Sequence, residues 1–153
     1  MGLFSFLNGG GKDVLKDQPA AAAATPEAEP LRASALLAYV KQLGLPYNTL
    51  TVKTSAKTVT IIGEVAKQED AEKITLAVGN VKGVETVDNQ LVVKAPAPEA
   101  KYYTVVKGDT LSLIAKAQYG DMMKYPVIFE ANKPLLKDAD DIEPGQVLRI
   151  PAL

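Results

Sequence analysis

The sequence of 153 residues contains no cysteine, no histidine and no tryptophan, and its aromatic residues are six tyrosines and three phenylalanines. Without cysteine there are no disulfides, no zinc-thiolate sites and no cysteine nucleophiles. Without histidine the chain lacks the usual general base near neutral pH and the commonest metal ligand. Its serines therefore have no histidine to activate them. These absences argue against hydrolase chemistry, so we expect a binding protein without catalytic residues rather than an enzyme.

An excess of charge of one sign is also lacking, because 17 Lys and Arg residues are matched by 18 Asp and Glu residues, for a formal net charge of −1. This balance gives no electrostatic reason to expect nucleic acid or an anionic membrane as the main partner. No apolar run approaches the length of a membrane span. The N-terminus lacks the basic start and the apolar stretch of about 7–15 residues that a secretory signal needs. We therefore expect a cytoplasmic protein without a membrane span.

Two changes of composition divide the chain. Residues 18–30 are rich in alanine and proline, which predicts a semi-extended tether because proline interrupts helices. Residues 95–101 contain a second, shorter Pro-Ala stretch, which predicts a linker. These breaks predict an apolar leader over 1–17, a first domain over 31–94 and a second domain over 102–153. Each domain is near the lower size at which one core sustains a fold, so docking of the two would stabilise both.

The first predicted domain shows helical and strand patterns in turn. Apolar residues recur at helical spacing over 31–43, and β-branched runs over 50–54 and 57–62 predict a hairpin. A second helix is predicted over 68–78, and a third strand over 84–93. The predicted order is α-β-β-α-β.

The second predicted domain has the order β-α-α-β. Its first strand precedes a turn whose Asp109 or Thr110 can cap a helix. Pro126 suits the first turn of a second helix, which is expected to end at Asn132. A closing strand follows over 147–150. The fold class is therefore α+β, with two small domains joined by the Pro-Ala linker.

Several of these motifs resemble known domains. The first predicted domain resembles a BON domain in its Gly63-Glu-Val65, Gly83-Val84 and Val87-Asp-Asn89-Gln-Leu91 motifs. The second resembles a LysM domain in its Tyr103-Thr-Val-Val-Lys-Gly108-Asp-Thr-Leu111 motif. With its Met-Gly-Leu-Phe leader and its Pro-Ala linker, the whole chain resembles the family of bacterial cytoplasmic potassium-binding proteins. The resemblance implies that the protein binds K⁺, changes conformation on binding, and serves as an intracellular ion sensor in the stress response.

The resemblance also implies where K⁺ binds. In the family, main-chain carbonyls of the loop after the second helix and of the leader hold the ion. Carried over to this chain, the candidate ligands are Leu7, Gly10, Gly79, Val81 and Val84. Carbonyls suit K⁺ because they can replace the water of a weakly hydrated monovalent ion, and carbonyls at a helix end lack intrahelical partners. We expect Rb⁺ and Cs⁺ to substitute for K⁺, and we expect a monomer.

Simpler interpretations of the same residues stay open. From the sequence alone Gly79 is most simply the C-cap of the second helix, and Gly83 an ordinary turn residue. The apolar leader around Phe4, Phe6 and Leu7 suits a frayed terminus, a membrane-surface anchor or a plug against the first domain. The plug is favoured because the leader lacks a basic face.

A second function also stays open, because many LysM domains bind N-acetylglucosamine-containing glycans such as peptidoglycan in the cell envelope. The family groove lies between the turn at 108–111 and the loop at 133–142. Under the potassium hypothesis, the LysM domain instead closes on the BON domain when K⁺ binds. We expect Tyr102, Tyr103 and the second LysM helix to dock there on the 79–84 loop.

Overall fold

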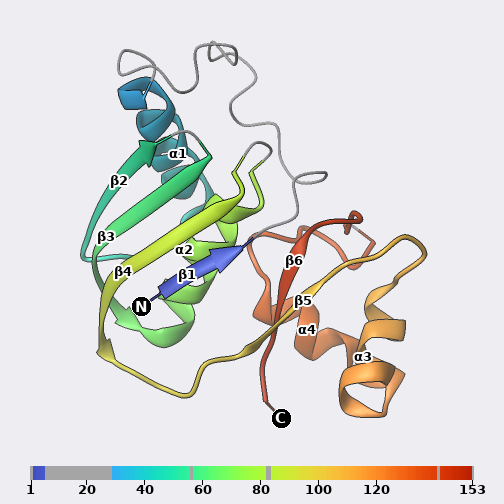
Figure 1. Ribbon diagram of the computed structural model, residues 1–153. Coiled ribbons are helices and arrows are strands. Elements are labelled where there is room, and N and C mark those ends of the chain that lie inside the picture. The colour runs from blue at the N-terminus through green and yellow to red at the C-terminus, as the bar shows by residue number, and fades with distance from the viewer. Residues whose placement is uncertain (1, 6–28, 56, 82–83, 141, 153) are drawn as a thin grey trace.

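The computed structural model describes residues 2–5, 29–55, 57–81, 84–140 and 142–152 (Figure 1). These residues form two units that lie side by side, a first unit built on a four-stranded sheet and a second unit built on a two-stranded sheet. Each unit combines its sheet with helices, so the predicted α+β class with two domains is confirmed. None of the helices in these described stretches is long and apolar enough to cross a membrane.

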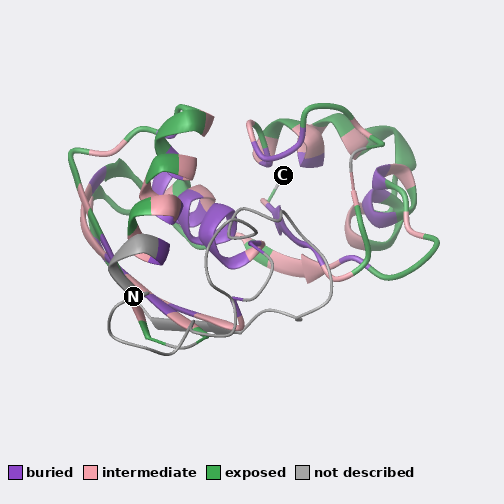
Figure 2. Cartoon of the chain, turned by 90° about the horizontal axis from the view of Figure 1, so that it is seen from above, coloured by how far each residue is buried: buried purple, intermediate pink, exposed green. Residues whose placement is uncertain are grey.

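The described residues of the first unit form four strands and two helices. Its elements are β1 (Gly2–Ser5), α1 (Glu29–Leu43), β2 (Thr49–Ser55), β3 (Thr58–Lys67), α2 (Gln68–Gly79) and β4 (Thr86–Ala95). The strand order is β1-β4-β3-β2, in which β3 and β4 are parallel and the other pairs are antiparallel. A parallel pair needs a crossover, which α2 supplies. Both helices cover one face of the sheet (Figures 1 and 2).

The core of the first unit follows from the strand pattern. In β3, Val59, Ile61 and Val65 are buried and face the helices, while the residues between them are only partly covered. Helix α2 is buried far beyond the single apolar face that the sequence predicts, since even Glu72 is only 2% exposed. The reason is visible in Figure 2, where α2 lies between the sheet and the second unit.

The second unit has a small core of its own. Its elements are β5 (Lys101–Thr104), α3 (Leu111–Tyr119), the 3₁₀ turn η2 (Met122–Lys124), α4 (Tyr125–Ala131) and β6 (Val147–Ile150). Strands β5 and β6 pair antiparallel, and the core gathers Leu111, Ile114, Ile128, Leu136 and Leu148.

Local signals placed the helix ends of this second unit correctly. Of the two candidate caps for α3, Thr110 is the one used, because its Oγ1 accepts a hydrogen bond from the Leu113 N–H at 3.1 Å. Asp109 accepts hydrogen bonds from the Tyr103 hydroxyl and the Val106 N–H instead. Asn132 is the C-cap of α4, as predicted.

Several element bounds differ from the prediction because sheet pairing extends the strands. Strand β3 runs on to Lys67, which pairs with Ala95 of β4, and β5 begins at Lys101, so strand occupies both ends of the predicted linker. Helix α1 begins at Glu29, inside the predicted tether, because Pro30 is compatible with a first helical turn.

The leader contributes an element that no sequence pattern indicated. Its residues Gly2–Ser5 form the edge strand β1, which pairs antiparallel with β4. None of the three interpretations of the leader included a strand, because four residues are too few to show a strand period. Phe6 and Leu7 lie outside the described residues.

Candidate functional site

The candidate site centres on the C-terminal end of α2. The helix includes Gly79, and Asn80 follows as the C-cap with an ordinary φ of −81°. The Asn80 N–H donates to the Leu76 carbonyl at 2.9 Å, and the Val81 N–H donates to the Val78 carbonyl at 3.3 Å. The interpretation of Gly79 as a C-cap is therefore wrong. Asn80 ends the helix instead, in a backbone conformation that needs no glycine.

The next turn brings the remaining described candidates together. The Val84 N–H donates to the Val81 carbonyl at 3.1 Å, which holds the main chains of these two residues together. Val81 is 2% exposed and Val84 is 1% exposed, so both side chains anchor this loop in the core. A carbonyl oxygen has two lone pairs, so the Val81 oxygen retains capacity for a further partner. Gly79 at the end of α2 is thus followed closely along the chain by Val81 and Val84, whose side chains are both buried.

Strand β1 ends opposite the first residue of β4, close in the sequence to the candidate residues. Ser5 lies opposite Thr86, which is two residues beyond Val84. Leu7 follows Ser5 by two residues, a separation that the chain spans in at most about 7 Å. Leu7 and Gly10 themselves lie outside the described residues.

Asn80 also joins the two units. Its side-chain Nδ2 donates to the Val147 carbonyl at 2.9 Å, and its Oδ1 accepts from the Val147 N–H at 2.9 Å. The amide therefore makes both hydrogen bonds that a neighbouring strand would make to this residue of β6. The C-terminal turn of α2, where the candidate loop begins, is consequently fixed to the second unit.

A buried ion pair forms a second junction between the units. Arg149 Nε lies 2.8 Å from Glu72 Oε1, and their side chains are 9% and 3% exposed. Glu72 Oε2 also accepts from the Ala100 N–H at 3.2 Å and from Gln68 Nε2 at 3.3 Å. Arg149 Nη1 donates to the Ala131 carbonyl. The two charges are therefore held by several further hydrogen bonds, as a buried pair requires.

Burial raises the pKa values of two ionisable side chains, Tyr102 and Asp70. Burial raises the pKa of Tyr102 well above its usual range, with further increases from the charges of Glu72 and Glu99, so its hydroxyl stays neutral. Burial, and then the charge of Glu69, raise the pKa of the Asp70 carboxyl. Within the described stretches of the chain, no three acidic side chains converge on a common metal position.

The docking residues differ in part from those expected. Tyr102, which was expected on the 79–84 loop, packs against the core of the first unit together with Leu135 and Val147. Tyr103 was wrongly included, because it packs in the core of the second unit and donates to Asp109. The element that lies against α2 is β6 rather than the second helix α4. Sequence patterns did not single out Glu72, Asn80 or Arg149 because their partners are 67 or 77 residues away.

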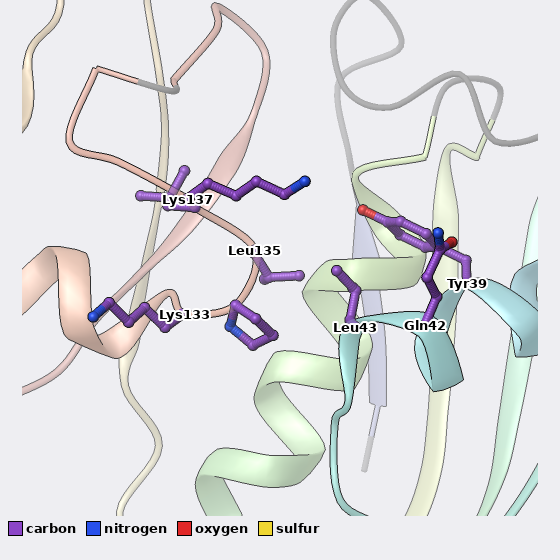
Figure 3. A pocket seen from close by; sticks show the side chains of 8 residues that line it. Tyr39, Gln42, Leu43, Lys133, Leu135 and Lys137 are labelled. Atoms are coloured by element: carbon purple, nitrogen blue, oxygen red, sulfur yellow. The ribbon is translucent and has the colours of Figure 1, made fainter.

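A cleft of about 520 Å³ opens beside this junction, between α1 and the loop after α4. Figure 3 shows Tyr39, Gln42 and Leu43 of α1 on one side and Leu135 and Lys137 on the other. The two units therefore meet along α2 and remain apart along part of α1.

Comparison with known proteins follows the same division. The BON domain model matches residues 30–95, and the LysM domain model matches residues 103–151. The chain is 39% identical over 152 residues to the potassium binding protein Kbp of Escherichia coli O6:H1, and the match covers 99% of both chains. The chain belongs to the Kbp family. The predicted resemblance is thereby confirmed, and the first and second units are called the BON and LysM domains below.

Two other relatives share parts of this Kbp-family chain. An uncharacterized protein of Deinococcus radiodurans is 34% identical over 132 residues, which are 78% of this chain and 51% of that protein. The esterase Rv1288 of Mycobacterium tuberculosis is 47% identical over 53 residues, which are 35% of this chain and 11% of that protein. Because the second match covers so little of the esterase, it assigns no esterase chemistry here.

Proposed function

We propose that this protein binds K⁺ and acts as an intracellular potassium sensor in the cytoplasm, without enzymatic activity. The observation that carries the proposal is the similarity along the whole chain to a protein named for potassium binding. The match covers 99% of both chains and therefore includes the leader, both domains and the segments that join them. The similarity therefore supports K⁺ binding by the two-domain protein as a whole rather than by one isolated domain.

The end of α2 is the part of the BON domain that best suits K⁺. The last carbonyls of a helix have no intrahelical donor, and the helix dipole makes this end negative. We place the ion on the carbonyls of Gly79, the last residue of α2, and of Val81 and Val84, which follow it with buried side chains. The fit is chemical, since neutral carbonyl oxygens replace the water of K⁺ at little cost, whereas smaller or divalent ions hold their water more tightly.

The leader supplies the other proposed ligands, Leu7 and Gly10. What supports this assignment is the pairing of Ser5 with Thr86, because Leu7 is two residues from Ser5 and Val84 is two residues from Thr86. Strand β1 would thus serve to position the leader ligands rather than only to close the edge of the sheet.

Ion selectivity tests the proposal. We expect K⁺, Rb⁺ and Cs⁺ to bind more tightly than Na⁺, and Mg²⁺ not to compete, because a carbonyl site favours large and easily dehydrated monovalent ions. Isothermal titration calorimetry with each chloride salt, at constant ionic strength, measures these affinities. Equal affinities for Na⁺ and K⁺ would contradict a carbonyl site.

Removal of the leader tests the ligand assignment. A protein that lacks residues 2–11 is expected to lose at least tenfold in K⁺ affinity, of the order expected when one or two ion contacts are removed. Deletion of residues 19–28, which are equally many and contain no proposed ligand, is the matched control and should leave the affinity unchanged. Unchanged K⁺ binding without residues 2–11 would show that the leader holds no ligand.

Glycan binding by the LysM domain is the alternative, and the domain arrangement does not favour it. Leu135 belongs to the loop at 133–142 that was expected to line the glycan groove. It is 8% exposed and packs in the core cluster of the BON domain. Part of that loop is therefore committed to the contact between the domains.

A further inference from the structure

Strand β6 is held by two asparagine side chains, one from each domain. Asn80 of the BON domain makes two hydrogen bonds to the main chain of Val147. Asn132 of the LysM domain does the same to Arg149, with Nδ2 at 2.9 Å from the carbonyl oxygen and Oδ1 at 2.8 Å from the N–H nitrogen. Asn132 thus binds β6 to its own domain, whereas Asn80 performs the same task across the domain boundary.

We propose that Asn80 is the positioning residue that couples K⁺ binding to docking of the LysM domain, an inference that rests on the proposed function. Its main chain lies between Gly79 and Val81, two of the proposed carbonyl ligands. Its side chain belongs entirely to the contact with β6. One residue is therefore shared by the ion site and the domain junction.

The coupling follows from the geometry of this one residue. With β6 in place, two hydrogen bonds hold the Asn80 side chain, and the peptide groups on either side of it are restrained. When β6 departs, both bonds exchange for water and the start of the loop loses that restraint. A site built from several carbonyls depends on their mutual placement, so the docked form binds K⁺ more tightly. By linkage, K⁺ then favours docking by the same factor.

The ion pair of Glu72 and Arg149 sets the orientation of the docked domain. Glu72 precedes Asn80 by eight residues, about 12 Å along a helix, while their partners Arg149 and Val147 are about 7 Å apart along β6. Two contacts at separate points along α2 fix both the direction of β6 relative to the helix and the distance between the two elements. Both of these polar contacts can be hydrated when the domains separate, whereas the apolar packing of Tyr102, Leu135 and Val147 on the BON core favours the docked form.

Four full-length proteins test the coupling: the wild type, Asn80→Ala, Glu72→Lys and the double variant. Glu72→Lys places a cation against Arg149 and should separate the domains, while in the separated form its side chain is solvated. Titration calorimetry with KCl and NaCl gives the affinities, and small-angle scattering with and without K⁺ gives the radius of gyration. We use Asn48→Ala as a matched control, because the Asn48 side chain donates to Glu64 at an exposed site far from β6 in the chain.

Asn80→Ala is expected to weaken K⁺ binding by up to about tenfold, the order of two lost hydrogen bonds, and Asn48→Ala to leave it unchanged. Glu72→Lys should weaken K⁺ binding as well, and adding Asn80→Ala to it should cause no further loss, because Asn80 no longer has a partner. K⁺ should make the wild type more compact and leave Glu72→Lys unchanged.

Two results would overturn the coupling. Equal effects of Asn80→Ala in the wild type and in Glu72→Lys would show that Asn80 acts on the loop alone. An unchanged radius of gyration at saturating K⁺ would show that the ion does not drive docking. In both cases the wild type still binds K⁺ in the calorimeter. Absence of K⁺ binding by the wild type would instead refute the proposed function itself.

Discussion

Replacement of Gly63 by alanine is expected to remove most of the stability of the BON domain. Gly63 lies in β3 between Leu50 of β2 and Leu91 of β4, with a φ of +151° that side chains rarely adopt. A Cβ atom at this position would lie 2.1 Å from the Thr49 carbonyl oxygen and 2.7 Å from its carbon. Strand β2 would have to move away from β3, so we expect a loss of more than about 4 kcal/mol.

Denaturant unfolding followed by circular dichroism measures this loss. Gly44→Ala is the matched control, because Gly44 also has a positive φ of +77° but no atom within 4 Å of a new Cβ. It should cost about 1–2 kcal/mol from backbone strain alone. Similar losses in the two variants would show that β2 shifts easily and that the clash with Thr49 adds nothing to the loss of unfolding free energy.

Replacement of Arg149 by methionine is expected to have the second largest effect. Glu72 would remain buried without its partner, and removing one member of a buried ion pair costs about 3–5 kcal/mol. The domains can avoid part of this cost by separating, which exposes Glu72 to water. We therefore expect a lower unfolding free energy in denaturant together with faster cleavage between the domains in limited proteolysis.

The double variant Glu72→Met with Arg149→Met separates the cost of an unpaired charge from the loss of attraction. Replacing both charges by apolar side chains is expected to recover most of the loss. The exposed pair of Lys57 and Glu85, 3.3 Å apart with side chains 59% and 45% exposed, is the control. Lys57→Met should cost less than about 1 kcal/mol. A double variant no more stable than Arg149→Met would show that the ion pair itself holds the domains.

Much of the fold could be predicted from local sequence because its determinants are close along the chain. The apolar spacing over 31–43 gave α1, and the β-branched runs over 50–62 gave the hairpin of β2 and β3. Thr110 is the N-cap of α3 and Asn132 is the C-cap of α4, as predicted. Periodicity and capping act over four residues or fewer, so each pattern contains the interaction that produces it.

The candidate site was less accessible to sequence reasoning for a physical reason. A carbonyl ligand is part of the main chain, so any residue can supply it and no side-chain pattern marks it. Family resemblance alone pointed to Gly79, Val81 and Val84. The sequence-based interpretation of Gly79 as the C-cap of α2 was wrong. That error arose because the helix end is decided by Asn80, whose side chain is bound to β6 rather than to its own helix.

The sequence by itself determined the two α+β domains, their order and most of their elements. Only the tertiary structure decided that Gly2–Ser5 pairs with β4, that α2 is enclosed on two sides, and that Glu72 and Asn80 meet β6. These contacts join residues 67 or more positions apart, and they depend on hydrogen bonds and charges that become specific only once water is excluded. Local patterns contain neither the distant partner nor the burial that gives such a contact its energy.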